Sequence, residues 1–276
     1  MRTWITGLVG GLLLASLWLS MPVVANPTMT RLAPTATAIR GQYLLGDYLF
    51  VSRTFRDHTP NKNHLTCQRC PAFVAEFTAN IGAGIRFVSS KQQLLMTQKP
   101  ISLDKRSFSV SIWLRRDTPR HERVIISHGV AGKPAFELGI GSNHAPFCRS
   151  AGVTIRALKA IDTQAHMVTC AFDMPRRQLR LYVDQRLVAQ QKAPPLSGNG
   201  KRILAVGARW LNNPAKPSQP TKGAWFGGQI ARIVLTNHAV TDSDVRRLFS
   251  QLQRPQTATA TSTPTATSTP TATSTP

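Results

Sequence analysis

The sequence is poor in acidic residues. Only 12 of its 276 residues are Asp or Glu, against 34 Lys or Arg, which gives a formal net charge of +22 at pH 7. Glycoside hydrolases need two carboxylates beside the scissile bond, and two carboxylates on one strand face the same cleft only at positions i and i+2 or i+4. The glutamates Glu76, Glu122 and Glu137 have no acidic neighbour at such a spacing. We therefore expect no glycosidase-type catalysis.

Other signatures of catalysis and of metal binding are also missing. The chain has no Gly-X-Ser-X-Gly elbow and no His-Glu-X-X-His motif, which mark serine hydrolases and zinc proteases. Its seven histidines do not fall into a ligand-like cluster. Calcium needs several oxygen ligands with carboxylates among them, and the acidic residues are too scattered to supply these. The sequence thus predicts a protein that is not an enzyme and has no tight metal site.

No apolar run reaches the roughly 20 residues that a membrane-spanning helix needs. The run from Ile5 to Leu19 is interrupted by Gly, Ser and Thr, follows the basic Arg2 and precedes the small residues Val23–Ala25. This order is typical of a secretory signal peptide cleaved after its small residues, and an uncleaved membrane anchor is the alternative. We predict an exported, extracellular or cell-surface protein with a signal peptide at 1–25, a linker at 26–41 and no transmembrane anchor in this chain.

Residues 255–276 have no large apolar side chain. The sequence Thr-Ala-Thr-Ser-Thr-Pro occurs there three times in tandem, at 259–264, 265–270 and 271–276. Such a segment cannot bury enough surface to offset its ordering entropy, and regular proline with β-branched threonine favours an extended chain. The composition is typical of a stalk that carries O-linked sugars or of a plain solvated linker.

Cysteine is scarce, with four residues in the whole chain. In an exported protein such cysteines are expected to form disulfides. Cys67 and Cys70 form a CxxC motif in a segment that reads as loop and strand, which disfavours a redox site at a helix start. Cys148 and Cys170 are 22 residues apart, which disfavours a four-cysteine zinc site. The pairing that we favour is Cys67–Cys70 and Cys148–Cys170.

Residues 42–254 form one block whose size suits a single core. Apolar Leu179, Leu181 and Val183 alternate with polar side chains, which indicates a strand with one buried face, and a turn at 184–186 makes the segment a hairpin. The same reasoning predicts short strands at 43–50, 107–114, 123–127, 136–140, 153–158, 167–172, 203–207 and 229–235, and two more within 85–96. Their spacing favours an antiparallel two-sheet sandwich.

One helix is expected after these strands. Thr241 can cap it, Asp244 stands three residues later in a capping-box arrangement, and Val245, Leu248, Phe249 and Leu252 share one face. The predicted fold class is therefore all-β with one short C-terminal helix, and we expect this helix to contribute stability and not chemistry.

Six segments resemble the laminin-G-like domain of the concanavalin A-like superfamily, in the order in which that family has them. They are the polar loop 57–66, the strand 107–114, the segment 166–173, the hairpin 179–188, the segment 226–233 and the helix start 241–245. Each motif is weak alone, but their common order is specific. The resemblance implies a two-sheet jelly roll that binds glycans or extracellular proteins, often near a calcium ion.

The chain departs from the family pattern where calcium ligands are expected. Ser89–Gln93 replaces an acidic cluster, Ala231 stands where the family has an aspartate, and Ala165 replaces a tryptophan. We therefore expect folding without calcium.

Glycan sites combine an aromatic platform with hydrogen-bonding side chains. Trp113 and Tyr182 lie on strand faces opposite the predicted core, and Trp210 and Trp225 lie in loops. Arg180 could hold an acidic sugar by a bidentate contact. These five are our candidate ligand-binding residues. The alternatives are that Trp113 belongs to a second buried layer, since tryptophan is mostly buried in proteins, and that Arg180 is an ordinary solvent-facing residue.

The sequence therefore predicts a recognition or adhesion module that binds carbohydrate. Basic residues also gather in short clusters, and such a surface attracts polyanions. The alternative is thus a structural interaction domain that binds a protein partner or a cell-wall polyanion through its charge. We expect no specific recognition of nucleic acid.

Overall fold

The computed structural model describes residues 43–78, 82–117, 121–131, 135–198, 200–211 and 221–253, all within the compact unit 37–276. The predicted signal peptide at 1–25, the predicted linker at 26–41 and the repeat-bearing segment 255–276 lie outside the described residues, so these assignments stay predictions. Within the described part of the chain, no helix combines the length and the apolar character needed to cross a membrane.

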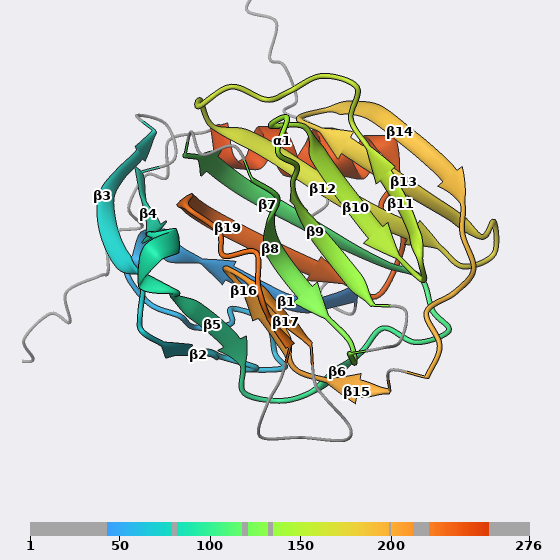
Figure 1. Cartoon of the computed structure of the whole chain (residues 1–276), viewed down its shortest axis with the longest axis horizontal. Coiled ribbons are helices and arrows are strands. Elements are labelled where there is room, and N and C mark those ends of the chain that lie inside the picture. Colours follow the sequence, from blue (N-terminus) through green and yellow to red (C-terminus); the bar gives the residue numbers. More distant parts are fainter. Residues whose placement is uncertain are drawn as a thin grey trace, which may run out of the picture. The chain divides into compact units, whose positions relative to one another are not determined.

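Two antiparallel sheets make up the domain (Figure 1). The eight-stranded sheet has the order β14 (Arg186–Lys192), β13 (Gln178–Val183), β12 (His166–Asp173), β7 (Phe108–Arg116), β19 (Gly228–Thr236), β4 (Gly82–Phe87) and β3 (Ala72–Thr78), and β1 (Leu44–Leu49) also pairs with β19. The seven-stranded sheet has the order β11 (Val153–Arg156), β10 (Pro146–Ser150), β9 (Phe136–Ile140), β8 (Arg123–His128), β16 (Leu204–Val206), β5 (Leu94–Thr97) and β2 (Leu65–Gln68). This arrangement confirms the predicted two-sheet jelly-roll sandwich.

Smaller elements complete the fold. They are the pair β6 (Ile101–Ser102) and β15 (Lys201–Arg202), the pair β17 (Arg209–Leu211) and β18 (Thr221–Gly223), the 3-10 turns η2 (Phe50–Ser52) and η3 (Ser89–Lys91), and the helix α1 (Asp242–Gln253). The sequence did not indicate β2, β3, β10, β17 or β18. These strands are short or lie at or near a sheet edge, where the alternation of apolar and polar residues is weakest.

The main core lies between the two sheets. In β7, the alternate residues Phe108, Val110, Ile112 and Leu114 are fully buried in this core, as their period of two requires. From the other sheet, the ring of Phe136 packs edge-on against Phe108 with 5.1 Å between centroids.

Helix α1 covers the outer face of the eight-stranded sheet, the face turned away from the main core. Val245 and Leu248 are buried there in a second apolar cluster together with side chains of the sheet. The capping box is formed, because the backbone N–H of Thr241 donates to Asp244 Oδ2 at 3.0 Å and that of Asp244 donates to Thr241 Oγ1 at 3.2 Å. The helix therefore adds a third layer on one side of the sandwich.

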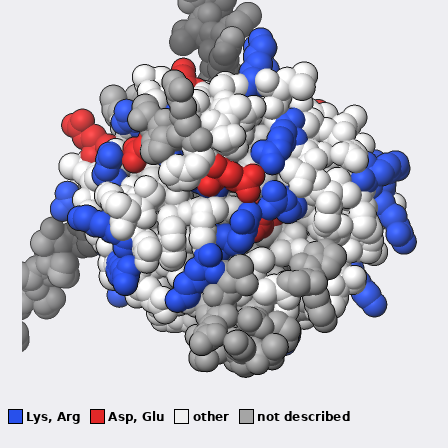
Figure 2. Space-filling model, viewed as in Figure 1, with Lys and Arg blue, Asp and Glu red and all other residues white. Residues whose placement is uncertain are grey.

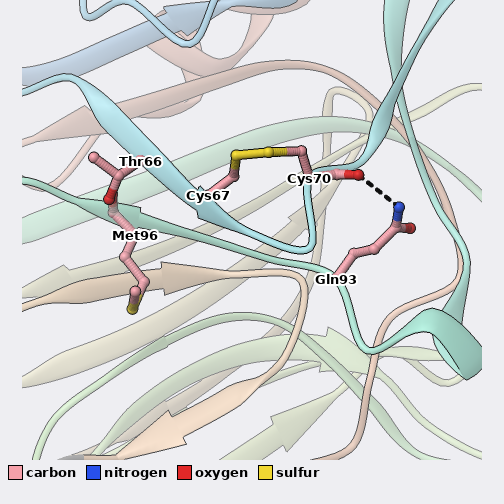
Figure 3. Close-up of a disulfide and its surroundings, with 5 residues drawn as sticks. All are labelled: Thr66, Cys67, Cys70, Gln93 and Met96. Atoms are coloured by element: carbon pink, nitrogen blue, oxygen red, sulfur yellow. Dashed lines mark hydrogen bonds between the residues drawn. A yellow bond between two sulfur atoms is a disulfide. The ribbon is translucent and has the colours of Figure 1, made fainter.

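Both predicted disulfides are present. Cys148 of β10 and Cys170 of β12 join the two sheets across the core, with 6.0 Å between their Cα atoms. Cys67 and Cys70 close the turn that follows β2, next to β5 (Figure 3). The side-chain amide of Gln93, the residue before β5, donates to the carbonyl oxygen of Cys70 at 2.8 Å. The Cys148–Cys170 bridge thus links the two sheets, and the Cys67–Cys70 bridge closes a turn at the surface.

Removing the two bridges should have unequal effects on stability. A disulfide restricts the unfolded chain more when it closes a longer loop, so replacing Cys148 and Cys170 by Ala should lower the free energy of unfolding by roughly 3 kcal/mol, and replacing Cys67 and Cys70 by Ser by less than roughly 2 kcal/mol. Urea denaturation of both double variants measures this. An equal loss in the two would contradict the assignment of the main structural role to Cys148–Cys170.

Candidate ligand-binding face

The aromatic platform expected from Trp113 and Tyr182 is not formed. The two side chains do lie opposite the main core, as the alternation predicted, but α1 covers them there and leaves Trp113 2% and Tyr182 0% exposed. The Tyr182 hydroxyl donates to Asp242 Oδ1 at 2.9 Å, and burial together with this hydrogen bond raises the pKa of Tyr182 to about 12. The expectation of an accessible platform is therefore wrong, and the alternative of a second buried layer is correct.

The Arg180 side chain contacts this buried layer. Its Nη1 donates to the Tyr182 hydroxyl at 3.1 Å, and its Nη2 lies 3.8 Å from Asp173 Oδ2. With its guanidinium engaged and only 14% of its side chain exposed, it is not an open ligand contact.

Replacing Tyr182 by Ala should lower the free energy of unfolding by roughly 3–5 kcal/mol, because it empties a large buried site. Tyr182→Phe should cost less, about 2 kcal/mol, since it keeps the ring and removes the two hydrogen bonds that the hydroxyl makes with Asp242 and Arg180. Urea denaturation tests both, with Tyr43→Ala as the control at a 39% exposed tyrosine. A loss below about 1 kcal/mol for Tyr182→Ala would show that the ring is not part of the buried layer.

Trp210 and Trp225 lie on the opposite side of the molecule, at the outer face of the seven-stranded sheet. Both are half-buried and pack against a small apolar cluster of that sheet. The strand β17, which carries Trp210, lies over β8 and is held there by Ser127, whose Oγ accepts from the Trp210 N–H at 2.8 Å and donates to Ala208 O at 2.9 Å. Because the Lys222 ammonium lies 4.5 Å from the Trp210 ring centroid, it covers one face of that ring.

Charged side chains lie beside the antiparallel pair β17 and β18, on the same outer face of the seven-stranded sheet. The strand register places Glu137, Arg149 and Thr154 in one row across β9, β10 and β11, and Gly139, Phe147 and Arg156 in the next row. We call the five charged residues that gather here the arginine–glutamate cluster: Glu122, Glu137, Arg149, Arg156 and Arg209. Figure 2, seen from this side, shows acidic atoms in the middle of the face with Lys and Arg around them.

Two guanidinium groups of the cluster rest on a buried aromatic ring. The Phe147 ring packs across Gly139, where an added Cβ would lie 2.6 Å from a ring carbon, so only glycine leaves room for the ring. Above the ring lie the guanidinium carbons of Arg149 and Arg156, at 5.3 and 4.9 Å from its centroid. The attraction between cation and ring holds both groups over this part of the sheet.

The carboxylate of Glu137 is the buried centre of the cluster, with 2% of its side chain exposed. Arg209 holds it in a bidentate contact, with Nε 2.5 Å from Oε1 and Nη2 3.0 Å from Oε2. Arg149 Nη1 donates to the same Oε2. These pairings offset the cost of burying the charge.

Glu122 lies at the solvent side of the cluster. Partial burial alone would raise the pKa of Glu122, but hydrogen bonds from Arg156 and Arg209 and the charge of Arg149 outweigh it and hold this pKa below its ordinary value. A general acid for glycoside cleavage needs a raised pKa, so Glu122 is poorly suited to that role. What the cluster can do is form charge-assisted hydrogen bonds.

A groove with a volume of about 850 Å³ opens at one end of the sandwich, between residues 157–162 and 183–188. Its polar centre is His166, whose Nδ1 lies 3.1 Å from Asp184 Oδ2 and whose Nε2 lies 3.0 Å from Asp162 Oδ1. Hydrogen bonding to Asp184 and then to Asp162 raises the pKa of His166, although burial opposes this. Both ring nitrogens are engaged, so the imidazole has no free position for a ligand.

Because its pKa is raised, folded His166 holds its proton more tightly than the unfolded chain does. The stabilisation is complete below the ordinary histidine pKa of about 6.5 and is lost as the pH rises through the raised pKa. We expect this fall in the free energy of unfolding to disappear in His166→Gln. Urea denaturation of both proteins from pH 5 to 9 measures the difference, and a difference that does not vary with pH would contradict the assignment.

The residues present do not fit the calcium ion that the resemblance implies. Ala231 is fully buried and offers no side-chain oxygen, and η3 carries no carboxylate. Asp57, in the polar loop, has both oxygens occupied by donors from Asp47, Thr59 and Asn63 at 2.9–3.1 Å. In the described part of the chain, no three His, Cys, Asp or Glu side chains are grouped so that they could hold a metal. We assign calcium no role.

Sequence reasoning missed the arginine–glutamate cluster. Glu122 and Glu137 were judged isolated because no acidic residue lies near them along the chain, yet Arg209 binds both of them. One signal was present, since Arg149 and Arg156 each follow a core residue in a short alternating segment. Of the five candidate residues, only Trp210 and Trp225 lie together on the face that carries the cluster.

Comparison with protein families finds a match over much of the described domain. The model described as the concanavalin A-like lectin/glucanases superfamily matches residues 89–246, which is more than half of the chain. Comparison with curated proteins gives no match.

Solved structures resemble the fold at low sequence identity. Domain 4 of AbnA, an extracellular GH43 arabinanase from Geobacillus stearothermophilus solved with arabinotriose, has a TM-score of 0.59 and 16% identity over 75% of this chain and 98% of that one. The binding domain of botulinum neurotoxin DC, solved with rat synaptotagmin II, has a TM-score of 0.56 and 14% identity over 77% of this chain and 52% of that one. A structure of botulinum neurotoxin type C, whose cell entry depends on two ganglioside molecules, has a TM-score of 0.56 and 13% identity over 77% and 52%. The chain thus matches about half of each toxin chain, and the likeness shows the fold alone.

Proposed function

Since this chain belongs to the concanavalin A-like lectin/glucanase superfamily, we propose that it is an exported, non-catalytic module that binds carbohydrate in a recognition or adhesion role. The observation that carries the proposal is the outer face of the seven-stranded sheet, where two half-buried tryptophans lie on the same face as convergent hydrogen-bonding groups. Apolar surface with a few fixed polar groups is the usual composition of a small-ligand site.

The structural neighbours support a saccharide ligand. The arabinanase domain was solved with arabinotriose, and type C neurotoxin entry depends on gangliosides. Fold does not dictate function, so the weight of the proposal rests on the face and not on the likeness. The two disulfides are consistent with an oxidising, extracellular setting.

The charges around the two glutamates support the proposed non-catalytic role. Glu137 is buried and paired with two arginines, and the arginines around Glu122 lower its pKa. A general acid needs a raised pKa, whereas that of Glu122 is lowered, and the Glu137 carboxylate is buried against Arg149 and Arg209 with no free face toward a leaving group. The face is thus suited to holding a sugar and not to cleaving it.

The face is a better candidate than the groove at residues 157–162 and 183–188. In the groove, His166 uses both ring nitrogens on neighbouring aspartates, whereas Arg149, Arg156 and Arg209 present guanidinium groups with 28–43% of their side chains exposed. The second candidate function is binding of a protein partner or a cell-wall polyanion through charge. The net charge of +22 and the synaptotagmin-bound neighbour favour it.

Replacing Trp225 by Ala should lower glycan affinity about tenfold, because a stacked aromatic contributes on the order of 1 kcal/mol or more. Glycan-array binding and calorimetry on the exported protein, with the melting midpoint recorded for each sample, measure the effect. Tyr43→Ala removes a partly exposed aromatic side chain at the residue before β1 and serves as the matched control.

Salt separates the two candidate functions. A glycan signal that persists in about 0.5 M salt indicates a specific site, because exposed charges are screened within a few ångströms under those conditions. A signal that disappears with salt and does not change in Trp225→Ala would contradict carbohydrate recognition and favour the charge-based alternative.

A further inference from the structure

The arginine–glutamate cluster already binds two carboxylates, and one of them is reachable from solvent. Glu137 is buried, but 31% of the Glu122 side chain is exposed. Three guanidinium groups contact Glu122: its Oε1 lies 3.1 Å from Arg209 Nη2 and 3.6 Å from Arg149 Nη2, and its Oε2 lies 3.3 Å from Arg156 Nη2. Glu122 therefore marks an accessible position at which this face holds a carboxylate.

The cluster keeps one positive charge in excess, since three arginines face two glutamates. Arg156 is its most exposed member, at 43% of the side chain. A guanidinium has five N–H donors, and within the described part of the chain the side-chain hydrogen bond of Arg156 goes to Glu122. The Phe147 ring beneath fixes the group in place. The site thus presents pre-positioned donors to solvent.

We propose that this cluster is the subsite for the carboxylate of a uronic acid in an acidic polysaccharide, and that Glu122 occupies the position that the sugar carboxylate takes. The inference rests on the proposed carbohydrate function and names its ligand class. Guanidinium groups match a carboxylate in a planar, bidentate contact, as Arg209 and Glu137 illustrate in the same cluster.

Exchange of one carboxylate for another keeps the arginines paired. The sugar carboxylate forms contacts with Arg156 and Arg149, and Glu122 moves out toward solvent, where its charge is hydrated. The high positive charge of the chain raises the local concentration of an anionic polymer before this contact forms.

This arrangement gives Glu122 and Arg156 opposite effects on binding. Glu122 competes with the ligand, so Glu122→Gln frees the three arginines and strengthens binding. Arg156→Gln removes the most exposed donor and weakens it. A cluster with a structural role alone predicts that neither variant alters binding while the protein stays folded.

The test uses the full exported chain with polygalacturonate, alginate and hyaluronan, and with carboxyl-reduced forms of the same polymers. Calorimetry at about 0.15 M and 0.5 M salt should show binding to at least one uronan that carboxyl reduction weakens tenfold or more. Arg156→Gln should weaken it about tenfold, as expected for one charge-assisted hydrogen bond. Arg246→Gln, on the exposed side of α1, makes the same change in charge and should alter affinity less than about twofold.

Four results would overturn the proposal. Equal weakening by Arg156→Gln and Arg246→Gln, or preferred binding of polyphosphate over every uronan, would show attraction by charge. Equal binding of the acidic and carboxyl-reduced forms would refute the uronate while leaving the proposed carbohydrate function intact. Failure to bind any saccharide, on these polymers and on the glycan array, would refute both.

A second variant distinguishes loss of the proposed contact from loss of folding. Arg156→Lys keeps the charge but not the planar fork, and it should bind as weakly as Arg156→Gln if the fork recognises the carboxylate. Full recovery of affinity in Arg156→Lys would contradict the bidentate contact, and the melting midpoint of each variant establishes that the protein is folded.

Discussion

Burial of the Glu137 carboxylate is the constraint on which the outer face of the seven-stranded sheet depends. A buried carboxylate is tolerated when opposite charges and hydrogen bonds surround it, and loss of one partner leaves an uncompensated charge. Arg149 comes from β10 and Arg209 from β17, so their pairing with Glu137 fixes the β17–β18 hairpin against the sheet. The position of Trp210, beside Arg209, follows from the same pairing. The need to pair one buried carboxylate thus fixes the arrangement of neighbouring side chains on the outer face of the seven-stranded sheet.

Much of the fold could be predicted because the alternation of apolar and polar residues along a strand indicates which of its faces is buried. The apolar set of β7 and the hairpin of β13 and β14 were readable from residue spacing, and the cysteine pairing favoured for an exported chain is the one present. The alternation also placed Tyr182 correctly on the side opposite the main core. It could not tell that α1, about 60 residues further along, covers that side, because a period of two defines two faces and not what lies on each.

The candidate site was less predictable for a related reason. Glu122 and Glu137 share Arg149 and Arg209 through contacts across strands, and these depend on the register between β8, β9 and β10 and on the course of β17. A search for carboxylates that are close together along the sequence cannot detect these contacts. Gly139 shows the same limit, since its role appears only when the Phe147 ring on the neighbouring strand is seen to lie across it.

The Cys148–Cys170 bridge has a mechanical consequence for ligand binding. β10 carries Arg149 and Phe147 on one face and Cys148 on the other, and the bridge ties it covalently to β12 in the opposite sheet. If this face binds a polymer as proposed, tension on that polymer from flow or a moving surface would load β10 through Arg149. The disulfide would then transmit part of this load across the core to β12. The hydrogen bonds that pair β10 with β9 and β11 would not have to bear all of it.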